Sequence, residues 1–380
     1  MHTIEDYRFH PCELAFCGLS GSGKTTLITR LMAMLSRRHL VGYFKHGCHH
    51  FDIDRKGKDS DSARRAGARC VMISDPEKHA LVADGKPDDL WARLTLQNMD
   101  MLLIEGLKEL PVQKIVLIDH KEEITALLRA GKLASVRALV IPEANRVKEY
   151  GSFGVPVFHR DSVEEIAGFI EQLFHRQVAA RPLFGLVLTG GESRRMGTDK
   201  ALIRYHQTNQ LVHTATMLLS HCNQVFISCR PEQQHTYKRF GFPLIVDRYR
   251  DIGPLAGVLS AQQLYPASSW MVVSCDLPQL DPQTLQKLAS ERKPLCHATA
   301  FRHPRSAQPE PLCAVYEPKS HSRLLLNHSV GSNSLKAFLR QHHVHYLSVE
   351  NPEALDNINE PDEREATCLR LARTREGKRP

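Results

Sequence analysis

Gly18-Leu19-Ser20-Gly21-Ser22-Gly23-Lys24-Thr25 stands between an apolar segment, Leu14–Cys17, and an amphipathic segment, Lys24–Ser36. The stretch fits the spacing Gly-x-x-x-x-Gly-Lys-[Ser/Thr], and its flanks predict the strand and the helix that this motif requires. Backbone N–H groups of such a loop converge on phosphate oxygens, and the helix dipole adds to the attraction. An ordinary glycine turn before a helix is the less favoured alternative. We therefore predict a P-loop with the phosphate-binding residues Gly21, Ser22, Gly23, Lys24, Thr25 and Thr26.

Thr25 and Glu105 are the predicted metal ligands of this loop. Glu105 ends an apolar segment, Leu102–Ile104, that predicts a buried strand. A carboxylate at the end of a strand near a P-loop can hold a metal-bound water, and the Thr25 hydroxyl can bind the ion directly. We therefore expect Mg²⁺ as the cofactor of this site.

The segment 45–54 carries three histidines, one cysteine and two aspartates, enough ligands for Zn²⁺. These residues are crowded into one loop, whereas zinc sites usually draw their ligands from separated pairs. We favour a polar loop near the phosphates, with nucleotide or Mg²⁺ contacts as the next alternative.

Apolar and amphipathic segments alternate along the chain twice over. The first half predicts further strands at 115–118 and 138–141 and a closing helix at 163–174, and the second half predicts strands at 183–188, 225–228, 244–246 and 270–274. Such alternation predicts α/β domains in which helices cover both faces of a parallel sheet. We predict a first domain at 1–175, a linker at 176–182, a second domain at 183–372 and a charged tail at 373–380.

Leu188-Thr189-Gly190-Gly191-Glu192-Ser193-Arg194-Arg195-Met196-Gly197-Thr198-Asp199-Lys200 follows the first predicted strand of the second half. The carboxyl edge of a parallel sheet is where open α/β sheets bind ligands. Gly190 and Gly191 permit a close approach of the backbone to a triphosphate. A Walker loop is excluded, because no Gly-Lys-[Ser/Thr] follows. We expect Arg195 and Lys200 to act in catalysis by stabilising charge at the transferring phosphorus.

Two acids follow later strands of the second half. Asp276 comes after the strand at 270–274, where a carboxylate can hold Mg²⁺ between phosphate oxygens, and we take it as a catalytic residue and metal ligand. Asp247 ends the strand at 244–246 and is a candidate contact for nucleotide, acceptor or metal. Gly253-Pro254-Leu255-Ala256-Gly257 predicts another loop that approaches the ligand closely before a helix.

Composition points to anionic small molecules in a reducing compartment. A chain of 380 residues exceeds the usual size of one core, and its net charge of +8 is scattered, whereas nucleic-acid-binding proteins concentrate it. The ten cysteines stand singly, the N-terminus lacks the features of a signal peptide, and no apolar run approaches the ~20 residues that span a bilayer. We expect a soluble cytoplasmic protein that binds neither nucleic acid nor membrane.

The first half resembles the molybdopterin-guanine dinucleotide biosynthesis adaptor family over about residues 10–175. The matching pieces, in the family's order, are the P-loop, the segment 45–54, Gly57-Lys58-Asp59-Ser60, Arg64-Arg65-Ala66-Gly67-Ala68 and Ile104-Glu105-Gly106-Leu107-Lys108. The resemblance implies a three-layer, P-loop NTPase-like domain that binds GTP. The partners it implies are the molybdenum-insertion protein and apo-molybdoenzymes or their chaperones.

The second half resembles the molybdenum cofactor guanylyltransferase family over about residues 183–365. Five motifs keep the family's order: Leu188 to Lys200, Val246-Asp247, Gly253 to Gly257, Cys275-Asp276-Leu277-Pro278 and Asn357-Ile358-Asn359-Glu360-Pro361. The resemblance implies a three-layer, Rossmann-like nucleotidyltransferase domain. By position it implies GTP contacts at Leu188, Thr189, Gly190, Gly191, Lys200, Asp247 and Asp276, Mg²⁺ at Asp276, and molybdopterin contacts at Asn357 and Asn359.

The reaction implied is transfer of GMP from GTP to molybdopterin, with release of pyrophosphate. Cys229 departs from the family, which commonly has asparagine before Arg230; because a thiol is a weak hydrogen-bonding group, this nucleotide contact is not carried over. Gly190-Gly191 favours guanine, since the related cytidylyltransferases usually have alanine before a single glycine. The alternatives are a cytidylyl or sugar-nucleotide transferase, a P-loop switch or small-molecule kinase, and a first half that only tethers the transferase to its partners.

Overall fold

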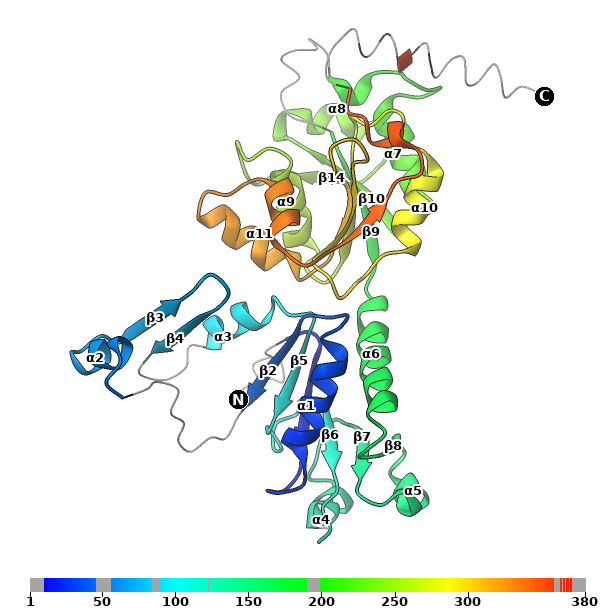
Figure 1. Ribbon diagram of the computed structural model, residues 1–380. Coiled ribbons are helices and arrows are strands. Elements are labelled where there is room, and N and C mark those ends of the chain that lie inside the picture. Colours follow the sequence, from blue (N-terminus) through cyan, green and yellow to red (C-terminus); the bar gives the residue numbers. More distant parts are fainter. Residues whose placement is uncertain are drawn as a thin grey trace. The chain divides into compact units, whose positions relative to one another are not determined.

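The computed structural model describes residues 10–45, 56–83, 89–121, 123–189 and 199–358, together with Glu363, Glu365, Thr367, Cys368 and Arg370. For residues 89–92 it describes the backbone alone. The chain divides into two compact units, residues 1–171 and 172–380, and each combines its own sheet with its own helices (Figure 1).

The sheet of the first unit has six strands. These are β1 (Glu13–Cys17), β2 (Val41–Lys45), β5 (Met101–Glu105), β6 (Lys114–Leu117), β7 (Val136–Ile141) and β8 (Val157–His159). Their order is β2-β5-β1-β6-β7-β8, and every neighbouring pair is parallel. The central strands β1, β5 and β6 are buried along their whole length, as expected for a sheet covered on both faces. The predicted parallel sheet is confirmed, while β2 and β8 were not predicted.

Helices and one hairpin complete the first unit. The helices are α1 (Lys24–Leu35), α2 (Asp59–Arg65), α3 (Asp89–Leu96), α4 (Glu123–Arg129), α5 (Val147–Tyr150) and the first part of α6 (Val163–Ala179), which continues past residue 171. The hairpin joins β3 (Cys70–Ser74) to β4 (His79–Ala83) in antiparallel register. Helix α1 packs on β1 and β5 through an apolar stripe at Leu27, Ile28, Leu31 and Leu35. Helices α4 and α5 bury Ile124 and Tyr150 against β6 and β7.

Helix α6 is longer than the sequence predicted. The pattern predicted a helix over 163–174, whereas the structure continues it to Ala179. Val178 is buried four residues after buried Phe174, which follows Ile170 by the same spacing, so the apolar face continues for another turn. The helix therefore includes residues 176–179 of the segment predicted as a linker.

The sheet of the second unit has seven strands. These are β9 (Leu183–Leu188), β10 (Gln224–Cys229), β11 (Leu244–Val246), β12 (Ser269–Ser274), β13 (Ala298–Arg302), β14 (Pro309–Tyr316) and β15 (Val344–Ser348), in the order β11-β10-β9-β12-β14-β13-β15. The predicted parallel arrangement is correct for β9 to β12. It is wrong for β14, which runs antiparallel to β12 and β13, because β13 and β14 are joined by a short turn without a crossover helix.

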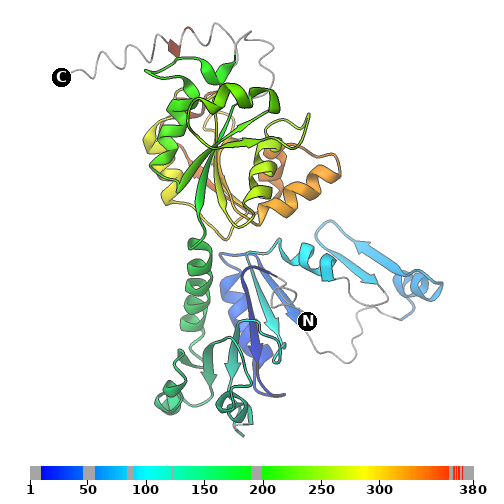
Figure 2. The ribbon, with the colours of Figure 1, turned by 180° about the vertical axis from the view of Figure 1, so that it is seen from behind.

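Helices cover both faces of this second sheet. They are α7 (Gln210–Leu219), α8 (Gln234–Lys238), α9 (Leu255–Leu264), α10 (Pro282–Ser290), α11 (Ser320–Ser329) and α12 (Leu335–Gln341). Val187 faces a core shared with α7, α8 and α10, whereas its neighbours Leu186 and Leu188 face a core shared with α9, α11 and α12. The predicted three-layer arrangement is confirmed for this unit (Figures 1 and 2). Within the described ranges of both units, no helix is long and apolar enough to cross a membrane.

Candidate nucleotide-binding and transfer sites

The first candidate site is the loop between β1 and α1. Strand β1 ends at Cys17 and α1 begins at Lys24, so the predicted strand, loop and helix are confirmed. Gly21 and Gly23 have φ values of 78° and 85°. Residues with a Cβ rarely adopt this left-handed backbone, so the conformation of the loop depends on these two glycines.

The structure brings together Lys24, Thr25 and Glu105. Thr25 Oγ1 donates to the two carboxylate oxygens of Glu105, at 2.9 and 3.1 Å. This contact forms because β5 pairs with β1, which places the end of β5 beside the loop. Lys24 Nζ donates to the carbonyl oxygens of Gly18 (3.1 Å) and Leu19 (2.7 Å), which holds the ammonium across the loop.

Glu105 is kept ionised by its surroundings. Burial opposes its ionisation, but hydrogen bonds from Tyr43 and Thr25 and the charges of Lys45 and Lys24 outweigh it and lower the pKa of the carboxyl. Tyr43 OH donates to Glu105 Oε2 at 2.9 Å, and Lys45 Nζ lies 3.6 Å from Oε1. Burial lowers the pKa of Lys24, and the charge of Glu105 counteracts it. The carboxylate is thus ionised and contacts Thr25, Tyr43 and Lys45, and Mg²⁺ at Thr25 and Glu105 stays a prediction.

A cavity of about 170 Å³ adjoins this loop. It is smaller than the roughly 300 Å³ at which pockets for whole ligands begin, and it suits one part of a nucleotide. Three predicted phosphate-binding residues line it, together with side chains at the ends of β6 and β7 and after β8. The lining residues are Ser22, Gly23, Thr26, Leu27, Arg30, Leu117, Ile118, Val140, Arg160 and Asp161. The histidine-rich segment, except Lys45, lies outside the described residues.

The second candidate site lies at the carboxyl edge of β9 and β12, which are parallel neighbours. Leu188 ends β9 and is buried in the core. Thr189 follows it, also buried, and its Oγ1 donates to the carbonyl oxygen of Ser228 at 2.9 Å. This bond ties the start of the predicted loop to the neighbouring strand β10.

Lys200 and Asp276 both hydrogen-bond to the backbone of the same residue, Ile358. Lys200 begins a 3₁₀ turn, Lys200–Leu202, and its Nζ donates to the carbonyl oxygen of Ile358 at 3.2 Å. The N–H of Ile358 donates to the carbonyl oxygen of Asp276 at 2.9 Å. Two residues far apart in the sequence, which were predicted to act together, therefore contact the same residue, Ile358.

The Asp276 carboxyl is suited to a cation. Its Oδ1 atom is buried and has no hydrogen-bond partner among the described residues. Burial raises the pKa of this carboxyl, against a hydrogen bond with Ser274 and the charge of Lys200. Within the described ranges, no three His, Cys, Asp or Glu side chains gather as a metal-binding group. A nucleotide-bound Mg²⁺ needs only one or two carboxylates, because phosphate oxygens and water supply the other ligands.

Asp247 lies beside the same edge, after β11. Its Oδ1 accepts a hydrogen bond from Ser228 Oγ at 2.7 Å. Burial raises the pKa of Asp247 to about 6, although the Ser228 hydrogen bond and the charge of Arg230 lower it. Gly257, in the first turn of α9, packs against this pair, and a Cβ there would lie 2.3 Å from Ser228 Oγ. The predicted loop at 253–257 therefore brings helix backbone close to the site.

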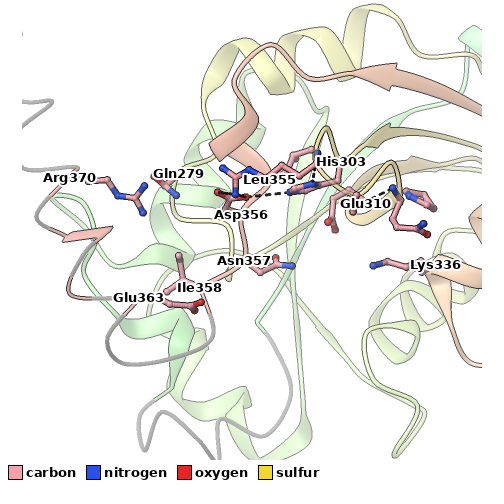
Figure 3. Close-up of a pocket in the computed structure, with 14 residues that line it drawn as sticks. Gln279, His303, Glu310, Lys336, Leu355, Asp356, Asn357, Ile358, Glu363 and Arg370 are labelled. Atoms are coloured by element: carbon pink, nitrogen blue, oxygen red, sulfur yellow. Dashed lines mark hydrogen bonds and ion pairs between the residues drawn. The ribbon is translucent and has the colours of Figure 1, made fainter.

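Asn357 and Ile358 line a cavity of about 480 Å³ (Figure 3), and Ile358 is the residue whose N–H donates to the carbonyl oxygen of Asp276. Burial raises the pKa of Glu310, another lining residue, and the negative charge of Asp276 adds to the rise. The remaining lining residues include four with cationic or basic side chains. These are His303, Arg305, Lys336 and Arg370.

Four predicted site residues lie outside the described residues: Gly190, Gly191, Arg195 and Asn359. Cys229, which replaces the asparagine expected there, is buried in the core, and burial raises its pKa to about 11. Sequence reasoning missed Ser228 and Glu310. Ser228 ends a predicted strand and could have been found by that position. Glu310 lies on β14, which was not predicted.

Comparisons with known proteins match both units. Residues 13–141 match the family described as molybdopterin guanine dinucleotide synthesis protein B, and residues 185–346 match the family described as a MobA-like NTP transferase domain. A protein from Nostoc sp., named as a probable molybdenum cofactor guanylyltransferase, is 31% identical over 184 residues, covering 48% of this chain and 88% of that protein. The chain belongs to the molybdenum cofactor guanylyltransferase family.

This family member carries a second, MobB-like domain, as predicted from the order of its motifs. It is 34% identical over 186 residues to the molybdenum cofactor biosynthesis bifunctional protein of Synechocystis sp., with 49% of this chain and 54% of that protein covered. It is 38% identical over 117 residues to the molybdopterin-guanine dinucleotide biosynthesis adapter protein of Haemophilus influenzae, with 30% of this chain and 65% of that protein covered. This chain thus spans about half the length of the Synechocystis protein and under two thirds of the Haemophilus influenzae protein.

Proposed function

We propose that the second unit transfers GMP from GTP to molybdopterin and releases pyrophosphate. The observation that carries this proposal is the contact of Lys200 and Asp276 with Ile358 at the carboxyl edge of β9 and β12. Ile358 and its neighbour Asn357 also line the cavity of about 480 Å³. A nucleotide held at the strand edge and an acceptor held in the cavity would therefore meet at Lys200 and Asp276.

The transfer needs no covalent intermediate on the protein. The terminal phosphate of molybdopterin is itself the nucleophile, and a phosphate at neutral pH needs no strong general base. The Lys200 ammonium stabilises the negative charge that develops around the α-phosphorus, as preorganised cations do in phosphoryl transfer. Arg195 is proposed to act with it. Mg²⁺, when bound to Asp276, would neutralise charge on the α- and β-phosphates.

The cavity supports the assignment of the acceptor. Molybdopterin carries a phosphate, so a binding site for it needs cationic groups near the point of transfer. His303 and Arg305 both contact Asp356, each at 3.3 Å. Lys336 lies on the same cavity as Asn357 (Figure 3). We assign Lys336 to the acceptor phosphate and Asn357, with Asn359, to the pterin side.

The first unit is proposed to be a GTP-binding adaptor with Mg²⁺ at Thr25 and Glu105. The proposal rests on the P-loop geometry and on the adapter proteins to which this unit is similar. Its partners would be the molybdenum-insertion protein and apo-molybdoenzymes or their chaperones. We place the reaction in the cytoplasm; the nine cysteines that the structure describes are free thiols, as is usual there.

Two lysine variants test the assignment of the reaction to the second unit. Lys200→Ala should lower kcat for pterin dinucleotide formation by about 100-fold or more, because it removes the cation at the transferring phosphorus. Lys24→Ala, the matched control in the other phosphate loop, should leave kcat within about twofold of the wild type. The measurement is pyrophosphate release together with pterin dinucleotide formation. Loss of transfer in Lys24→Ala, with transfer retained in Lys200→Ala, would place the chemistry in the first unit and contradict the proposal.

A further inference from the structure

The residue before Lys200 is held by two hydrogen bonds that the proposed reaction does not use. Asp199 caps the 3₁₀ turn Lys200–Leu202, with its Oδ1 accepting from the N–H of Ala201 at 3.1 Å. Its Oδ2 accepts from the hydroxyl of Tyr237 at 2.6 Å. One carboxylate thus joins the turn that carries Lys200 to a side chain of α8.

Tyr237 is a rigid anchor for this contact. Its side chain is fully buried in the core between the sheet and α7. The side-chain amide of Gln233 donates to its hydroxyl oxygen at 3.0 Å, which leaves the hydroxyl proton to Asp199. Burial raises the pKa of Tyr237, and the Asp199 carboxylate adds to the shift, so the phenol stays a neutral donor.

Two of the hydrogen bonds that position Lys200 join its turn to other parts of the unit. One is the bond from its own ammonium to Ile358, and the other is the bond from Tyr237 to Asp199. A turn of three residues has little internal stability of its own, since 3₁₀ hydrogen bonds are poorly aligned. Removal of the second bond would let the turn move, and misplacement of a catalytic group by about 1 Å can cost about 100-fold in rate.

We propose that Tyr237 is a positioning residue for GMP transfer: through Asp199 it fixes the turn that presents Lys200 to the transferring phosphorus. The inference rests on the transfer reaction proposed above. Tyr237 itself touches neither nucleotide nor acceptor in this account, so its loss should affect turnover more than binding of GTP.

The test is steady-state transfer kinetics of the full chain with Tyr237→Phe, Asp199→Asn and the double variant. Tyr237→Phe removes one hydroxyl and keeps the buried ring, and it should lower kcat by about 10-fold to 100-fold. KM for GTP should change by less than about threefold, because the cation is displaced and not removed. If Tyr237 acts through Asp199, the double variant should be no slower than the slower single variant.

Tyr316→Phe is the matched control. Tyr316 is equally buried in the same unit but in the core on the other face of the sheet, and its hydroxyl donates to the carbonyl oxygen of Pro311 at 3.0 Å. A kcat of Tyr237→Phe equal to that of Tyr316→Phe, or losses in the double variant that multiply, would overturn the proposal. If Tyr237→Phe folds poorly in a thermal melt, Gln233→Leu weakens the same anchor from outside and should lower kcat in the same direction. A wild-type chain without transfer activity would contradict the proposed GMP transfer. Normal turnover in Tyr237→Phe would contradict only the positioning role of Tyr237.

Discussion

At the scale of the residue, the two sites differ in how their carboxyls are held. Glu105 accepts hydrogen bonds from two hydroxyls, and these, with nearby lysines, lower its pKa. Burial raises the pKa of Asp247 to about 6, and this carboxyl accepts one hydrogen bond from Ser228. A carboxyl that costs stability in this way is typical of functional sites. We therefore propose that Asp247 contacts the nucleotide.

The pKa of Asp247 gives a prediction for stability. Because the folded-state value lies above the unfolded value, the folded chain holds more protons between about pH 4 and pH 6, and stability falls as pH rises through that range. Asn cannot ionise, so Asp247→Asn should raise the free energy of unfolding by up to about 3 kcal/mol at pH 8 and by much less near pH 4. Urea unfolding at the two pH values checks this. An equal effect at both would show that Asp247 is not perturbed in the folded state.

From the sequence, the candidate residues of each site could be predicted better than the side chains that hydrogen-bond to them. Thr25 and Glu105 were placed by the P-loop motif and a strand end, and Lys200 and Asp276 by the order of motifs. Tyr43 was missed because β2 was not predicted. Tyr237 was missed because a pairing between distant side chains leaves no local pattern in the sequence.

At the scale of the element, helix α9 is held close to the sheet by one small residue. A Cβ on Gly257 would lie 2.3 Å from Ser228 Oγ and 2.7 Å from Leu188 Cδ2. Both neighbours lie near the carboxyl ends of their strands, β9 and β10, and Ser228 also donates a hydrogen bond to Asp247. The approach of α9 therefore couples helix packing to the geometry of the site.

Gly257→Ala should destabilise the chain by about 1–3 kcal/mol, the usual cost of overpacking a buried contact. It should also weaken binding of GTP, since Ser228 must move. Gly168→Ala is the control: Gly168 lies within α6 with nothing near its absent Cβ, so this variant should stabilise by about 0.5–1 kcal/mol. Thermal unfolding and GTP titration measure both effects. A Gly257→Ala protein as stable as the wild type would contradict the close contact.

The sequence predicted continuous apolar strands well and strands of mixed composition poorly. Strands β1, β5 and β9 were found because they are continuous apolar runs. Strands β13 to β15 mix apolar and polar residues, and β2 is exposed at several positions. The end of α6 was placed too early, because the charged residues after Phe174 hide the continued spacing to Val178.

At the scale of the whole molecule, each nucleotide site is contained in one unit. The P-loop site uses β1, β5 and α1, and the transfer site uses β9, β12 and the segment at 356–358. The cores described above also consist of residues from one unit each. Two units with separate cores and separate sites are expected to respond to ligand separately.

Calorimetry should show two unfolding transitions, and GTP with Mg²⁺ should raise the temperature of both, because a ligand stabilises the state that binds it. Lys24→Ala should remove the shift of one transition and leave the other. A single unfolding transition whose temperature GTP raises equally in the wild type and in Lys24→Ala would contradict the separation of the sites.

Transfer of label from GTP is the measurement that tests the central claim most directly. The chain is incubated with molybdopterin, Mg²⁺ and GTP labelled on the α-phosphate, with labelled CTP, UTP and ATP in parallel. We predict that label from GTP alone appears in a pterin dinucleotide, with pyrophosphate formed in equal amount. Label from CTP in the product would mean that the base is cytosine, and release of inorganic phosphate from GTP without any pterin dinucleotide would contradict the account.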